Sequence, residues 1–224
     1  MKKITVKNLI EFRSKNDRTR LTYVSNLKKE KISSEGDSGG DYWISCLSCL
    51  RNVFKFEDAD LLDEKTSFLQ NKIEQTEIKR IKDQFQRNID ILTNFKEYDF
   101  LELKPNAEIT FMKQTKSDTI LDVNGLLIEA KPCHVFSFSK NGSSEIGAVW
   151  FIAKLNGFTK AELGMFADIT YRYLNKYYSN DFYVNPDYCI AVDLFHGQEV
   201  NYSNLKNGEI PILIDSTIDD LRKI

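Results

Sequence analysis

Three carboxylates and one ammonium group lie close together between Asp118 and Lys131. Asn124-Gly125 separates two runs of alternating apolar residues, and this dipeptide is typical of a two-residue hairpin turn because both positions need positive φ. Side chains alternate along a strand, and paired residues share a face. A two-residue turn therefore places Asp118, Asp122, Glu129 and Lys131 on one face of the hairpin. The opposite face is apolar.

These acidic and basic side chains are of the types that can hold a divalent cation beside a phosphodiester. Carboxylate oxygens suit Mg²⁺, so we expect Asp122 and Glu129 to be metal ligands, with Asp118 as a further or alternative ligand. The metal would polarise the phosphodiester and lower the pKa of a bound water. Lys131 would orient that water or stabilise charge. The other interpretation is an ordinary cross-strand pair, Asp118 opposite Lys131, with the remaining acids solvating one face.

The elements around the hairpin predict an α+β fold. Residues 1–104 have helical periodicity, and residues 105–224 contain the strands. The clearest helix covers 160–178, where Thr159 and Glu162 form a capping box. We expect the helical region to pack on a mixed, largely antiparallel sheet that includes the hairpin, as one compact unit. The other predicted strands are 108–113, 135–138, 146–154, 188–195 and 199–202.

The charge is balanced overall but uneven along the chain. The net charge is −2, so no global field favours nucleic acid. Residues 1–31, however, hold ten Lys or Arg against three Asp or Glu. A basic segment of this kind can grip phosphates, and we expect Arg13, Lys15, Arg18 and Arg20 to do so. A solvated helix face is the alternative interpretation.

Location and partners are indicated more weakly. The first residues lack the apolar core of a signal peptide, and no stretch is long and apolar enough to span a bilayer. The four cysteines lack the spacing of a disulfide framework, which favours reduced thiols and a cytoplasmic protein. A long helical stripe over 61–95 could contact a protein partner or a second copy. It is not a strict heptad, so packing within the chain is favoured.

Residues 108–195 resemble the PD-(D/E)XK nuclease superfamily. In that superfamily an Asp near the end of one strand and an E-x-K on the next serve Mg²⁺-dependent cleavage of nucleic acid, and a helix follows. Asp122 and Glu129-Ala130-Lys131 match this pattern, with 160–178 as the candidate helix. The resemblance implies a metal-dependent nuclease fold with Asp122, Glu129 and Lys131 as catalytic residues.

The match to this superfamily has departures that leave a second function open. No Pro-Asp pair precedes the E-x-K, because the only such pair is Pro186-Asp187. The predicted strand at 146–154 also separates the E-x-K from the helix. The alternative to a nuclease is a non-catalytic binding or adaptor subunit that keeps a nuclease-like shape without activity.

Overall fold

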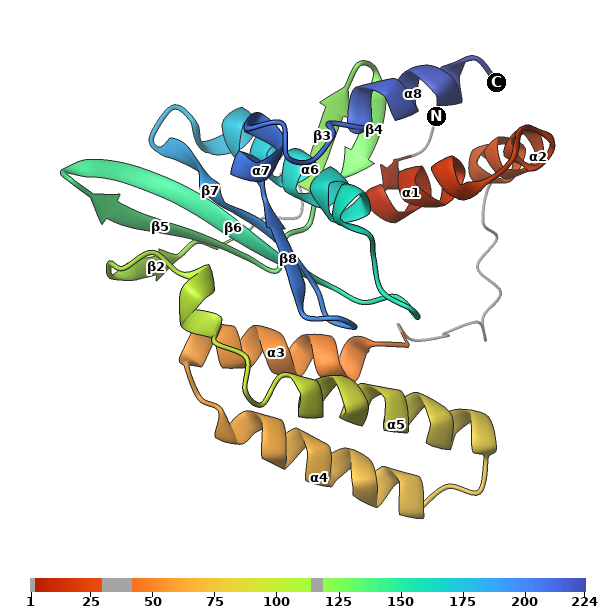
Figure 1. Ribbon diagram of the computed structural model, residues 1–224, viewed down its shortest axis with the longest axis vertical. Helices are drawn as coiled ribbons and strands as arrows, with labels where there is room; N and C mark the ends of the chain where they lie inside the picture. Colours follow the sequence, from red (N-terminus) through yellow and green to blue (C-terminus); the bar gives the residue numbers. More distant parts are fainter. Residues whose placement is uncertain (1–2, 30–41, 114–118) are drawn as a thin grey trace.

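The computed structural model describes residues 3–29, 42–113 and 119–224, and it confirms the α+β class. A five-stranded sheet forms the middle layer, with a long helix on one face and a group of helices below the other (Figure 1). The sheet order is β2-β5-β6-β7-β8. These strands are β2 (Ile109–Phe111), β5 (His134–Lys140), β6 (Ser143–Ile152), β7 (Tyr183–Asp193) and β8 (Gln198–Asn201).

The large sheet is mixed and mostly antiparallel, as predicted. Strands β2, β5 and β6 form an antiparallel meander, and β8 returns antiparallel to β7. Helix α6 (Lys160–Tyr178) carries the chain from β6 to the parallel strand β7. Its first turn has the predicted capping box between Thr159 and Glu162. The helix thus begins and ends where the sequence predicted.

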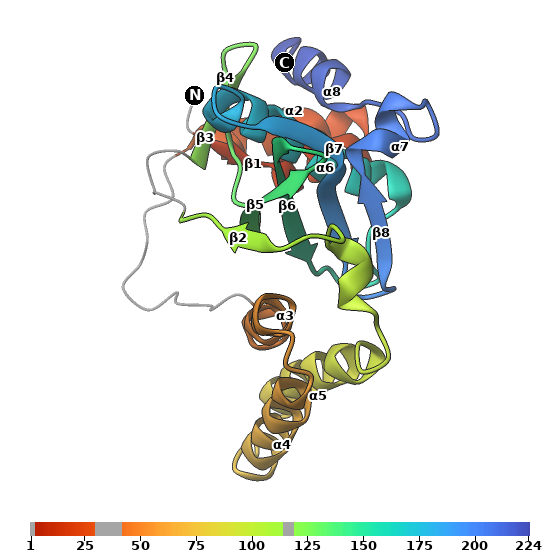
Figure 2. The ribbon, with the colours of Figure 1, turned by 90° about the vertical axis from the view of Figure 1, so that its left-hand side faces the viewer.

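Alternation along the strands gives the sheet two apolar faces and the protein two cores. One core joins α6 to the sheet through residues such as Ile146, Ala148 and Ala191. The other core lies on the opposite face and is rich in aromatic side chains, among them Phe136 and Phe151. Helix α3 (Ile44–Phe56) closes this second core, and its Phe54 contacts both rings. Figure 2 shows α3 lying next to the sheet.

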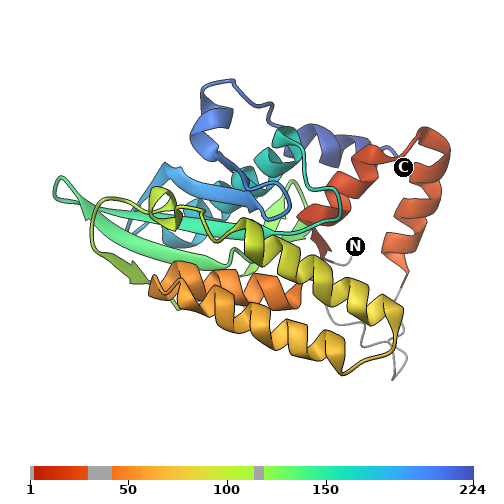
Figure 3. The same cartoon turned by 60° about the horizontal axis from the view of Figure 1, so that its bottom comes forward.

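The stripe predicted over 61–95 is not one helix, so that expectation was wrong. It forms α4 (Asp60–Glu74) and α5 (Lys79–Asn94), which fold back on each other and lie beside α3 (Figure 3). Folding back lets the two halves of the stripe bury apolar side chains against each other and α3. Leu69 and Leu92 are 0% exposed.

The hairpin does not belong to the large sheet, which corrects the expectation of a single sheet. Strands β3 (Ile120–Val123) and β4 (Leu126–Glu129) form a small sheet with β1 (Ile4–Thr5), in the order β1-β4-β3. Beyond Glu129 the chain passes Pro132, which cannot donate to a ladder, and enters the large sheet at β5. The apolar face of the hairpin packs into the core on the α6 side of the large sheet.

Most of the remaining helices lie around the hairpin on the α6 side of the large sheet, whereas the 3₁₀ helix over residues 100–103 belongs to the core that α3 closes. None of the described helices is long and apolar enough to cross a bilayer. Helix α8 is tied to α6 by Arg172, whose guanidinium contacts Asp168 at 2.8 Å and Asp215 at 2.6 Å. The bounds are α1 (Val6–Ser14), α2 (Asp17–Lys28), the 3₁₀ helix η1 (Phe100–Leu103), α7 (Tyr202–Lys206) and α8 (Ile214–Arg222).

Candidate functional site

The hairpin has the register that the sequence predicted. Asn124 and Gly125 form the turn with φ of 51° and 75°. Asp122 pairs with Leu127, and Glu129 pairs with Ile120. The predicted apolar face is buried, with Ile128 0% exposed.

Asp122 uses its carboxylate to close the turn. Its Oδ1 accepts the backbone N–H of Gly125 at 2.6 Å, and the side chain lies on the exposed surface. A short acidic side chain beside a tight turn commonly takes a local backbone donor in this way. Asp118 lies outside the described residues, so the structure places only Asp122 and Glu129 of the three predicted ligands.

Glu129 lies at the end of β4, where it neutralises two lysines. Its Oε1 is 2.7 Å from Lys3 Nζ and 2.7 Å from Lys131 Nζ. The Glu129 side chain is 18% exposed, whereas those of Lys3 and Lys131 are 57% and 53% exposed. Burial alone would raise the pKa of Glu129, but the hydrogen bonds from Lys131 and Lys3 outweigh it and hold that pKa below its ordinary value. The carboxylate is therefore ionised at neutral pH.

Glu129 and Lys131 line a cavity of about 270 Å³, which we call the E-x-K cavity. Its walls come from the start of α1, from α3, from the end of β4 and from β6. Two further cations face it, Lys7 and Arg51. With Lys3, which contacts Glu129, four cationic side chains surround one carboxylate. The uncharged lining includes Thr5, Leu47, Trp150, Phe151 and Phe166.

Backbone pairing brings the N-terminus of the chain to this cavity. Strand β1 lies parallel to β4, with Thr5 opposite Glu129. Thr5 is also the N-cap of α1, in a capping box with Asn8. Helix α1 therefore begins beside the end of the E-x-K strand, and Lys7 in its first turn faces the cavity. The Lys7 ammonium donates to the carbonyl of Ala153 at 3.3 Å.

Arg51 reaches the cavity from α3 and is fixed there by the start of β5. Its Nε donates to Cys133 Sγ at 3.1 Å, and its backbone carbonyl contacts His134 Nε2 at 3.0 Å. Burial raises the pKa of the Cys133 thiol and lowers the pKa of His134, so both are neutral at pH 7. In the part of the chain that the structure describes, the terminal guanidinium nitrogens of Arg51 bind no other group. They remain able to bind a ligand.

The predicted metal ligands do not come together at this cavity. Asp122 is turned onto Gly125, and the one carboxylate that faces the cavity already contacts two ammonium groups. Among residues 3–29, 42–113 and 119–224, no three His, Cys, Asp or Glu side chains are grouped so that they could hold a metal ion. Glu129 is thus the one predicted ligand that the structure places at this cavity, and its Oε1 contacts two ammonium groups there.

The four basic residues predicted to grip phosphates lie elsewhere. Arg13 donates to Thr217 of α8 at 3.0 Å, Lys15 pairs with Glu11 at 3.4 Å, and Arg20 pairs with Asp17 at 3.3 Å. The first contact joins α1 to α8, and the other two are local to α1 and α2. Arg18 is exposed on α2.

None of these four residues lines the E-x-K cavity. Of the cations that do line it, Lys131 was predicted, whereas Lys7 and Arg51 were not. Lys3, which contacts Glu129, was not predicted either. Only the basic character of the first residues hinted at the two lysines. Nothing in the local sequence distinguished Arg51 from the other charged residues of the predicted helices.

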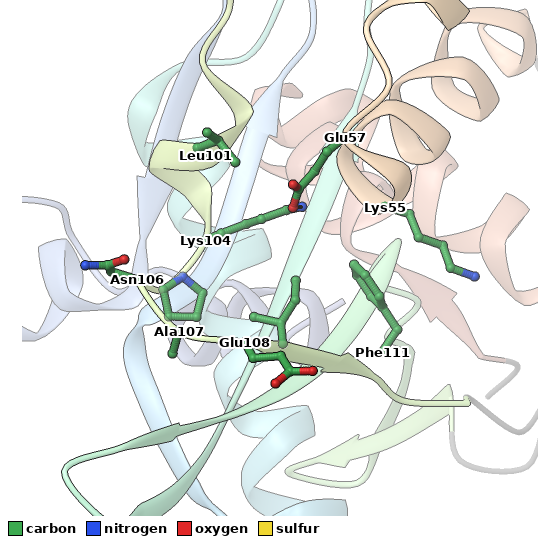
Figure 4. A pocket seen from close by; sticks show the side chains of 10 residues that line it. Lys55, Glu57, Leu101, Lys104, Asn106, Ala107, Glu108 and Phe111 are labelled. Atoms are coloured by element: carbon green, nitrogen blue, oxygen red, sulfur yellow. Dashed lines mark hydrogen bonds and ion pairs between the residues drawn. The ribbon is translucent and has the colours of Figure 1, made fainter.

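A larger cavity of about 700 Å³ lies at the far end of α3, between that helix, η1 and β2 (Figure 4). Glu57 and Lys104 point toward one another there and form an ion pair at 2.6 Å. The Lys104 ammonium also lies 4.8 Å from the centre of the Phe54 ring. These contacts occupy Lys104 in joining η1 to α3, so this cavity offers less charge to a ligand than the E-x-K cavity.

Comparisons with protein-family models, with curated proteins and with solved structures found no match for this chain. The resemblance to PD-(D/E)XK nucleases therefore rests on Asp122 and the E-x-K alone.

Proposed function

We propose that this protein binds nucleic acid by holding backbone phosphate in the E-x-K cavity. The observation that carries the proposal is the local charge: Lys7, Arg51 and Lys131 line the cavity with a single carboxylate, Glu129, which also contacts Lys3. Lysine and arginine are the usual partners of phosphate oxygens, and the fork of donors in a guanidinium matches their geometry. The cavity is large enough for a phosphate group.

Glu129 acts in this proposal as an internal counter-charge. Without a ligand its carboxylate contacts two of the four cations and offsets one unit of their charge. A phosphate that enters takes over part of those contacts, and Lys7 and Arg51 supply charge that no carboxylate of the described chain neutralises. Binding needs no metal ion. Because the net charge of the chain is −2, affinity depends on this local cluster.

The test is the affinity of labelled single-stranded and duplex oligonucleotides, measured by fluorescence anisotropy at two salt concentrations. Single-strand affinity falls with a log–log salt slope of about −0.7 per phosphate contact. We expect Lys131→Ala and Lys7→Ala each to weaken binding and to make that slope shallower by about 0.7. Lys140→Ala is the matched control, because Lys140 is exposed at the opposite end of β5. If Lys131→Ala and Lys7→Ala have the same affinity and salt slope as the control Lys140→Ala, the proposal is refuted.

The nuclease alternative is addressed in the same preparation. Wild type, Glu129→Ala and Lys131→Ala are incubated with DNA and with RNA in the presence of Mg²⁺ or Mn²⁺. If wild type cleaves and neither variant does, the protein is a nuclease, and the proposal of binding alone is wrong. We expect binding without cleavage, because Asp122 and Glu129 are engaged by the turn and by lysines.

A further inference from the structure

A second cavity of about 560 Å³ lies beside the E-x-K cavity, and we call it the aromatic cavity. Lys7 lines both. The walls also continue from one to the other. On α3 they pass from Leu47 to Trp43, and at the end of β6 they pass from Ile152 to Ala153. The two cavities are therefore successive sections of one groove between α1, α3, β6 and the start of α6.

The aromatic cavity has apolar walls with a few polar groups. Tyr42 and Trp43 lie edge to face, 4.8 Å apart, on one side. Phe158 lies on another, with the Lys154 ammonium 4.5 Å from its ring centre. Leu155 is 47% exposed at this cavity. Small-molecule sites typically have this composition and a volume of about 300–1,000 Å³.

Hydrogen-bonding groups line the same cavity. Glu11 and Ser14 of α1 and Glu162 of α6 supply oxygen atoms, and Lys7 and Lys154 supply ammonium groups. A planar ligand with apolar faces and a polar edge would meet both kinds of surface here. The faces would contact the aromatic walls, and the edge would meet the carboxylates or Ser14.

The position of Phe158 is fixed by a buried carboxylate. Asp193, at the end of β7, is 0% exposed and accepts the Phe158 N–H at 3.2 Å. The same carboxylate binds His196 Nδ1 at 2.9 Å. Gly157 has φ of 66°, and a Cβ there would lie 2.1 Å from His196 Nδ1. This loop therefore packs too closely for another residue at 157, and the wall is formed before a ligand arrives.

We propose that the aromatic cavity takes one unpaired base of a single-stranded nucleic acid whose phosphate lies in the E-x-K cavity. The adjacency of the two cavities and the charge of the first select this occupant, since Lys131 and Arg51 line the E-x-K cavity and Lys7 lines both. Lys154, in the aromatic cavity, is paired with Glu162 at 3.2 Å. A phosphate and the base attached to it are neighbours, as the two cavities are. A base inside a duplex is stacked and paired, so it cannot enter without being extruded. This inference rests on the proposed function and specifies its substrate as single-stranded.

The experiment compares an oligothymidylate with an abasic strand of the same length, which has the same phosphates and no bases. Stacking of a base on aromatic side chains contributes roughly 1–3 kcal/mol, so wild type should bind the oligothymidylate at least about fivefold more tightly. Leu155→Ala should reduce this preference and leave affinity for the abasic strand unchanged. Ile212→Ala is the matched control, because Ile212 is also 47% exposed and does not line the groove. Lys131→Ala should weaken binding of both strands.

Tryptophan fluorescence gives a second measurement that needs no substitution in the aromatic cavity. The chain has two tryptophans, so Trp150→Phe leaves Trp43 as the reporter inside the aromatic cavity. Oligothymidylate should quench Trp43, and the abasic strand should not. Equal affinity for both strands with no quenching would refute the base site and leave phosphate binding intact.

Three other outcomes overturn the inference. No binding of either strand would refute both proposals. Equal affinity for a duplex and a single strand would refute the single-stranded substrate. If thymidine monophosphate binds as tightly as the oligothymidylate, the ligand of this site is a free nucleotide and not a strand.

Discussion

Replacing Glu129 by glutamine separates the two roles that its carboxylate could have. Glutamine keeps the size of the side chain and removes its charge. In the structure the Glu129 carboxylate contacts the ammonium groups of Lys3 and Lys131 at 2.7 Å each. A bound phosphate has to compete with it for those groups. We therefore expect Glu129→Gln to bind nucleic acid more tightly than wild type, whereas a metal ligand would be lost by the same change.

The size of the gain follows from the exposure of the two pairs. The side chains of Lys3 and Lys131 are 57% and 53% exposed, so water screens both contacts. An exposed ion pair contributes about 0.2–1 kcal/mol. Two such pairs no longer compete with phosphate in the variant, which gives about 0.4–2 kcal/mol. This corresponds to roughly twofold to thirtyfold tighter binding.

The assay is anisotropy of a labelled single strand at low salt, with and without Mg²⁺. Glu108→Gln is the matched control, since Glu108 is an exposed carboxylate beside β2 and its loss changes the net charge equally. Tighter binding by Glu129→Gln alone supports a local counter-charge. Equal gains in both variants would show that only net charge matters, and weaker binding by Glu129→Gln would refute the reasoning.

Two further substitutions test the packing that positions the groove. Gly147→Ala should lower the free energy of unfolding by about 2–3 kcal/mol in urea, because the new Cβ would lie 2.5 Å from the Cβ of Tyr188 at the irregularity between β6 and β7; an unchanged midpoint would contradict this. Arg172→Met should cost about 3 kcal/mol near pH 7, because it leaves the carboxylate of Asp168, 1% exposed, without its cation. Burial already raises the pKa of Asp168, so folding favours its protonated form and the cost should shrink as the pH falls toward 4; a cost independent of pH would contradict the buried charge.

Local signals in the sequence were sufficient for the hairpin and for α6. Asn124-Gly125 fixes the turn through positive φ at two adjacent positions, and the observed register is the predicted one. Thr159 and Glu162 mark the start of α6 through a capping box. Each of these signals lies within a few residues, so no distant contact is needed to interpret it.

The candidate site depended on contacts that no local pattern shows. Strand β1 has two residues, too few for a period, and it pairs with β4 across more than a hundred positions of sequence. That pairing puts Lys3 and Lys7 beside Glu129. The orientation of Asp122 was also missed, although its place beside a tight turn was a signal for the hydrogen bond to the Gly125 amide.

The balance of charge explains why the site had to be found in three dimensions. The predicted basic residues of α1 and α2 already have local partners: Lys15 and Arg20 pair with Glu11 and Asp17, and Arg13 binds the Thr217 hydroxyl. Counting charges along residues 1–31 therefore points to α1 and α2. The groove instead collects one or two cations from each of several elements, so that no single segment is unusually basic there. The phosphate binding that we propose depends on that convergence, and we expect it to be lost if β1 does not pair with β4.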